Sequence, residues 1–80
     1  MLTFKTSKEW QELEGCSKKI GSFELSSISG RPAYICVGRT SEKKMIKIPK
    51  MVKGSYTLKK KLYRKVFIKG DRAIVSIKKL

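Results

Sequence analysis

Apolar and polar residues alternate over much of the chain, which is the pattern of β-strands that are buried on one face. Four short segments carry this alternation or a run of strand-forming residues: residues 2–5, the segment around Phe23 and Leu25, residues 33–37 and residues 44–48. The cluster Ser-Gly-Arg-Pro at 29–32 predicts a turn. Because Pro49 has no N–H for a central ladder, we expect the fourth strand to end there or to lie at a sheet edge.

Residues 56–69 carry the most regular alternation. Apolar side chains dominate the even positions, and lysines with two aromatic residues occupy the odd positions. The competing interpretation is a helix over 56–67, since Leu58, Leu62 and Val66 also recur at helical spacing. The β-branched and aromatic residues before the following turn favour a strand.

A Gly-Asp dipeptide at 70–71 separates this segment from a second strand-like run, which predicts a two-residue β-hairpin turn. The register then pairs Ile68 with Ala73 and Val66 with Val75. Both apolar pairs fall on one face, and a slip of one residue would mix the apolar and polar sets.

The N-terminal segment carries a helix signal. Thr6 and Glu9 have the spacing of a capping box, and Gly15 is a suitable C-terminal residue. We therefore predict a short helix at about 7–14 that covers an edge or end of the sheet. Trp10 would anchor it, or alternatively would serve as a stacking platform.

These elements predict a single domain spanning 1–80 that is α+β or mainly β. It would combine the short N-terminal helix, a curled antiparallel sheet of about five strands and the C-terminal hairpin. Closure of the sheet into a small barrel of the SH3-like or OB-like kind fits this pattern, because closure removes exposed strand edges.

Charge is distributed unevenly. The chain has 20 Lys and Arg against 6 Asp and Glu, a formal net charge of +14. Residues 1–40 contain six basic and four acidic residues, whereas residues 41–80 contain fourteen basic and two acidic residues. Such a concentration indicates a polyanionic partner, although a solvated lysine-rich surface is the alternative.

Several classes of site are excluded or disfavoured. The chain has no histidine, so it has no His-based zinc site or His general base. We therefore expect no metal site. Nucleotide-binding loop motifs are absent too, so we also expect no cofactor and no small-molecule substrate. No apolar run is long enough to span a membrane, and no secretory signal is expected, which suggests a cytoplasmic protein. Cys36 is interpreted as a small buried apolar residue, with a disulfide to Cys16 as the alternative.

On the predicted hairpin, basic side chains surround two aromatic residues on one face. The candidate site comprises Lys59, Lys61, Tyr63, Lys65, Phe67, Lys69, Arg72 and Lys78, and Lys47 extends it. Lysines neutralise phosphates, and exposed aromatic rings stack on unpaired bases. Alternatively, the two aromatic residues pack under the N-terminal helix, which leaves a purely electrostatic surface.

The sequence thus predicts a non-enzymatic nucleic-acid-binding protein. DNA is expected ahead of RNA, in a gene-regulatory or chromatin-like role. The alternatives are an RNA- or ribosome-binding protein, a protein-interaction module that docks on an acidic partner, and, as a minor one, a histidine-free ribonuclease. An exposed edge at 44–48 would allow a homodimer.

Overall fold

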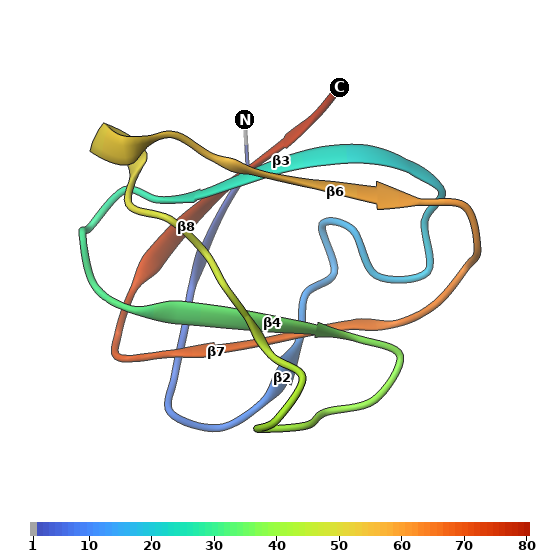
Figure 1. Cartoon of the computed structure of the whole chain (residues 1–80), viewed down its shortest axis with the longest axis horizontal. Coiled ribbons are helices and arrows are strands. Elements are labelled where there is room, and N and C mark those ends of the chain that lie inside the picture. The colour runs from blue at the N-terminus through green and yellow to red at the C-terminus, as the bar shows by residue number, and fades with distance from the viewer. Residues whose placement is uncertain (1) are drawn as a thin grey trace.

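Residues 2–80 form eight β-strands in two four-stranded antiparallel sheets, as described by a computed structural model (Figure 1). The strand order of the first sheet is β1 (Leu2–Lys5), β8 (Ile74–Lys79), β3 (Gly21–Ser27) and β6 (Tyr56–Lys60). The order of the second is β2 (Gln11–Glu12), β7 (Val66–Gly70), β4 (Ala33–Val37) and β5 (Ile46–Lys47). A 3₁₀ turn, η1 (Met51–Lys53), precedes β6. No helix within residues 2–80 combines the length and hydrophobicity needed to cross a membrane.

The hydrophobic core lies between the two sheets. In Figure 1, β3 and β6 lie on one side of the molecule, and β4, β7 and β2 lie on the other. Phe23 and Leu25 from β3 join Ile35 from β4 and Ile68 from β7 in one buried cluster. Because full burial of a large apolar side chain contributes roughly 1.5–3 kcal/mol, this shared core holds the sheets together. The fold is therefore mainly β, as one form of the predicted fold class had it.

Most of the predicted strands are confirmed. The segment 2–5 forms β1, Phe23 and Leu25 lie in β3, and residues 33–37 form β4. The predicted strand at 44–48 shortens to the two residues of β5, which lies at a sheet edge as Pro49 indicated. The helix alternative for 56–67 is wrong, because the segment contains β6, a loop at 61–65 and the start of β7. The favoured interpretation of 56–69 as one strand is confirmed only at its two ends, since that loop divides it.

The predicted C-terminal hairpin is wrong. β7 pairs with β4 and β2, whereas β8 pairs with β1 and β3 in the other sheet. Gly70 is the last residue of β7, where a Cβ would lie 2.6 Å from both the Pro32 carbonyl oxygen and Thr6 Oγ1. Glycine is required there for this close approach rather than for a hairpin turn. The positive φ of Arg72, 51°, then helps turn the chain toward the first sheet.

The predicted N-terminal helix is also wrong. The Thr6 N–H donates to the Ala73 carbonyl (2.8 Å), and Thr6 Oγ1 accepts from the Ala73 N–H (2.8 Å), so Thr6 continues the pairing of β1 with β8. Farther along, Gln11 pairs with Ile68, and the Leu13 N–H donates to the Val66 carbonyl (2.8 Å). A segment this short gains little from an isolated helix, and ladder bonds to β7 and β8 satisfy its backbone instead.

The architecture also differs from a single five-stranded sheet or a closed barrel. The two sheets keep separate edges, formed by β1 and β6 in the first and by β2 and β5 in the second. An isolated parallel bridge between Ser27 and Lys50 links the end of β3 to the segment after β5. Two sheets packed face to face bury the apolar side chains that alternate along each strand, so the fold does not need to close into a barrel.

The contact between Thr6 and Ala73 can be tested directly. Thr6→Val keeps the shape of the side chain but leaves the buried Ala73 N–H without an acceptor, so the free energy of unfolding should fall by about 1–3 kcal/mol. Thr6→Ser should retain most of the stability. Chemical denaturation measures the change. In a capping box Glu9→Ala would cost stability too, so a loss at Glu9 equal to the loss at Thr6 would contradict this structure.

Candidate nucleic-acid interface

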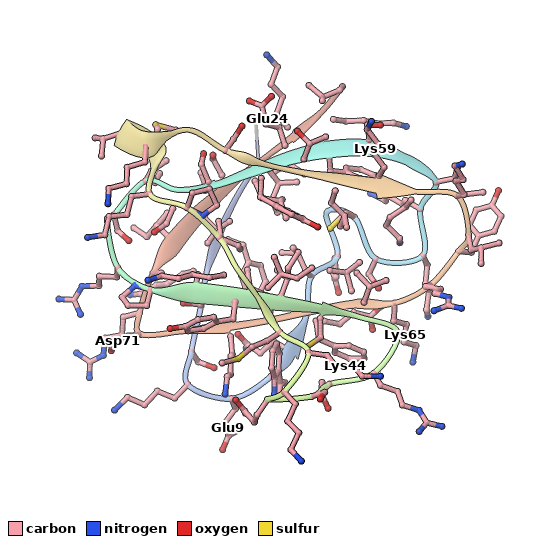
Figure 2. All side chains as sticks on the ribbon, viewed as in Figure 1. Glu9, Glu24, Lys44, Lys59, Lys65 and Asp71 are labelled. Atoms are coloured by element: carbon pink, nitrogen blue, oxygen red, sulfur yellow. The ribbon has the colours of Figure 1, made fainter. Side chains whose placement is uncertain are left out.

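The nine residues predicted as a binding site do not share one face. Lys59 and Lys78 lie on the outer face of the first sheet, Lys61, Tyr63 and Lys65 in the β6–β7 loop, Arg72 in the turn before β8, and Phe67, Lys69 and Lys47 on the outer face of the second sheet. Figure 2 shows Lys59 and Lys65 in different parts of the molecule. The predicted grouping depended on the hairpin, and it is lost because β7 and β8 belong to different sheets.

The outer face of the first sheet is polar rather than strongly basic. Glu24 of β3 pairs with Lys78 of β8, so an acid accompanies the cation there. Beside them, the hydroxyl groups of Ser26 and Ser76 form a hydrogen bond of 2.9 Å. Lys59 lies on the same face, so the face keeps a small excess of positive charge beside one acid and two mutually bonded serines.

The outer face of the second sheet carries aromatic and basic side chains in one row. Because Ile35 and Ile68 point into the core, their neighbours Tyr34 and Lys69 point outward. Tyr34 pairs with Lys69 on one side and with Lys47 on the other. At the end of the row, Lys69 Nζ lies 5.1 Å from the centroid of the Trp10 ring, within the range of a cation–π contact. We call Trp10, Lys69, Tyr34 and Lys47 the aromatic–lysine row.

Phe67 lies in the next row of this sheet, between Glu12 and Cys36. It is half-buried, as are Trp10 and Tyr34. The alternative packing of Phe67 and Tyr63 under an N-terminal helix is wrong, because no such helix forms and Tyr63 is 73% exposed.

The β4–β5 loop, residues 38–45, folds back toward this face. Cys36 Sγ donates to the Ser41 carbonyl (3.2 Å), and Glu42 forms an ion pair with Lys69. Beside the row, a hollow of about 390 Å³ is lined by Lys8, Pro32, Tyr34, Lys69, Gly70 and Asp71. The face thus combines aromatic surface, several cations and a fixed neighbouring loop.

Few of the basic side chains are neutralised. Within residues 2–80, ion pairs form between Arg31 and Asp71 (3.9 Å) and between Lys69 and Glu42. These involve two of the twenty basic side chains. The rest of the positive charge is therefore balanced by solvent ions, which a polyanion can replace.

Lys60 has a structural role. It is only 6% exposed, and Nζ donates to the carbonyls of Cys16 (2.7 Å) and Arg64 (2.6 Å). Desolvation lowers the pKa of Lys60, and the neighbouring Cys16 thiol partly opposes this shift. The ammonium group satisfies two carbonyls between β6 and its neighbouring loops, so it takes no part in the outer surface.

Both cysteines are free and buried, so the alternative of a disulfide between Cys16 and Cys36 is wrong. Burial raises the pKa of the Cys16 thiol to about 11. The part of the chain that the structure describes contains no group of three or more Cys, Asp or Glu residues placed to hold a metal ion.

Comparisons of the chain with protein-family models, with curated proteins and with solved structures found no match.

Lys47, Phe67 and Lys69 were predicted as site residues, on or beside a hairpin that does not form, and they lie on this face; Tyr34 was not predicted. The signal was present, since Tyr34 is the amphipathic residue between Ala33 and Ile35 in a strand interpreted as buried throughout. Alternation inside that short run would have placed its ring on the outer face. Trp10 was considered as a stacking platform, but on a helix rather than beside β2.

The raised pKa of Cys16 predicts a pH-dependent stability. The thiol ionises near its ordinary value of 9.0 in the unfolded chain but near 11 in the folded protein. The folded protein therefore binds more protons between these values, and its free energy of unfolding should fall as pH rises from about 9 to about 11. Cys16→Ala should lack this fall. The free energy of unfolding of both proteins is measured by chemical denaturation from pH 7 to 11. If the difference between the two proteins stays constant over this range, the prediction is contradicted.

Proposed function

We propose that the protein is a non-enzymatic nucleic-acid-binding protein, with DNA as its polymer. The supporting observation is the aromatic–lysine row, in which two aromatic rings alternate with two lysines across four adjacent chain segments. Lys69 also pairs with Glu42, whereas neither ion pair in residues 2–80 involves Lys47. Adjacent strands are about 4.7–4.9 Å apart, so the groups are closely spaced. A nucleic acid is a polymer that offers both phosphates for the cations and bases for the rings.

The chemistry of the cations supports backbone contact. Lysines outnumber arginines among the basic residues by sixteen to four. Lysine acts as a flexible point charge toward phosphate, whereas arginine has the planar group suited to reading base edges. Binding would thus depend on charge and tolerate many sequences, which suits a chromatin-like or general regulatory role on DNA.

A fluorescence titration tests the proposal. Trp10 is the single tryptophan of the chain and lies in the row, so bound polymer should change its emission. Duplex DNA, single-stranded DNA and RNA of equal length are titrated at several salt concentrations. We expect DNA to bind with an affinity that falls linearly on a log–log salt plot. Preference for RNA would support the RNA-binding alternative, and binding of none of the three near physiological salt would reject the proposal.

Substitution of Tyr34 tests the contribution of the row. Tyr34→Leu removes the ring on which a base would stack, and it should weaken binding of single-stranded DNA by about 1–3 kcal/mol. Tyr63→Leu is the matched comparison, because Tyr63 is an exposed tyrosine outside the row. Equal losses for the two variants would show that the row is not the binding surface. Thermal melting of each variant checks that the fold is intact.

A further inference from the structure

A separate cluster of cations lies where the β4–β5 loop meets the β6–β7 loop. A pocket of about 530 Å³ is lined there by Cys36, Arg39, Thr40, Ser41, Lys44 and Arg64, among others. Three of these residues are cationic, two carry hydroxyl groups and none is acidic. Two of the four arginines in the chain meet here, although they are far apart in the sequence.

The backbone explains how the two arginines come together. Gly38 adopts a positive φ of 87°, which glycine favours, and turns the chain out of β4. Its N–H donates to the Lys65 carbonyl (2.8 Å), so the start of one loop is fixed to the end of the other. Arg64 Nη1 lies 3.8 Å from the position that a Cβ on Gly38 would occupy, and the guanidinium therefore lies against the residue before Arg39.

The opposite side of the pocket is also held in place. The Ser41 carbonyl accepts from Cys36 Sγ (3.2 Å) and from the Lys44 N–H (3.3 Å), which closes the loop into a turn and positions Lys44. Figure 2 shows Lys44 and Lys65 on the same side of the molecule in that view. The loop geometry is thus set by hydrogen bonds, without any contribution from the three cations.

The charge of the pocket is uncompensated. Neither ion pair in residues 2–80 involves Arg39, Lys44 or Arg64. Three like charges around one hollow repel each other, and an anion in the hollow would relieve that repulsion. Guanidinium groups bind phosphate oxygens in a bidentate manner, and the hydroxyls of Thr40 and Ser41 are further donors. The volume is within the range of about 300–1,000 Å³ that is typical of ligand sites.

We infer that this pocket binds a phosphate group of the nucleic-acid backbone, with Arg39 and Arg64 as its principal ligands and Lys44 beside them. The assignment of the phosphate to a nucleic acid rests on the proposed function. The pocket adjoins the outer face of the second sheet that carries the aromatic–lysine row, because Cys36 both lines the pocket and pairs with Phe67 in the next row of that face. One polymer would therefore contact both features.

The first test uses inorganic phosphate as the probe and the intact chain labelled with ¹⁵N. Phosphate and chloride are added at matched ionic strength, and amide shifts are followed by NMR. Phosphate, but not chloride, should shift the amides of residues 38–41 and 44. Shifts spread evenly over all exposed lysine-rich segments would overturn the pocket as a specific site.

The second test measures binding of a single-stranded DNA oligonucleotide to charge variants. The double variant Arg39→Gln/Arg64→Gln should bind about tenfold more weakly than the parent, the factor that corresponds to about one charged hydrogen bond. The matched control is Lys19→Gln/Lys53→Gln, which removes the same charge from exposed positions elsewhere. The variant Arg39→Lys/Arg64→Lys keeps the charge but loses the planar groups. Its affinity should fall between that of the parent and that of the Arg39→Gln/Arg64→Gln variant.

The outcomes separate the two proposals. If the oligonucleotide binds and the arginine variant matches the lysine control, the pocket is overturned and nucleic-acid binding stands. If phosphate shifts the loop amides but no nucleic acid binds, the proposed function fails, and the pocket is a site for a free phosphate compound. Thermal melting of each variant shows whether a loss of binding comes from unfolding.

Discussion

The packing of the two sheets against each other is the constraint on which the rest of the molecule depends. Each strand gives alternate side chains to the shared core, so Ile35 and Ile68 lie inside and Tyr34 and Lys69 must lie outside. In a chain of 80 residues the core is small and admits few polar groups. The outer surface of the second sheet is consequently built from side chains outside this core, and they include the aromatic–lysine row with Phe67 and Glu12 beside it.

The excess of positive charge is the second constraint. A net charge of +14 on so small a protein opposes the compact state by self-repulsion. The fold buries one of its basic residues, Lys60, and gives that ammonium two carbonyl partners. These two hydrogen bonds avoid the larger cost of a buried charge with no partner. The other cations remain on the outside, where bound anions reduce the repulsion and stabilise the folded protein.

The sequence predicted which residues face inward better than it predicted which strands pair. Alternation identified β1 and β3 and put Val66, Ile68 and Val75 inside, and a run of strand-forming residues identified β4. The same alternation is compatible with β7 and β8 paired in one hairpin and with β7 and β8 in different sheets. It therefore did not determine which strands pair with each other. In the structure this point is fixed by long-range backbone bonds: the Gly70 N–H donates to the Ser7 carbonyl (2.8 Å), and the Asp71 N–H donates to the Pro32 carbonyl (3.0 Å).

The helix and site predictions failed for the same reason. A capping signal at Thr6 is local, whereas the bonds that Thr6 makes with Ala73 join residues at opposite ends of the chain. Three of the predicted site residues share a face with Tyr34 and Trp10: Lys47, Phe67 and Lys69. Two others, Lys59 and Lys78, lie on strands of the other sheet.

The two acids of residues 41–80, Glu42 and Asp71, both form ion pairs. Glu42 pairs with Lys69 and so holds the β4–β5 loop against the second sheet, and Asp71 pairs with Arg31 from another turn. Because both acids are engaged there, the pocket at Arg39 and Arg64 has no internal counter-charge, and the balancing anion must come from outside the chain.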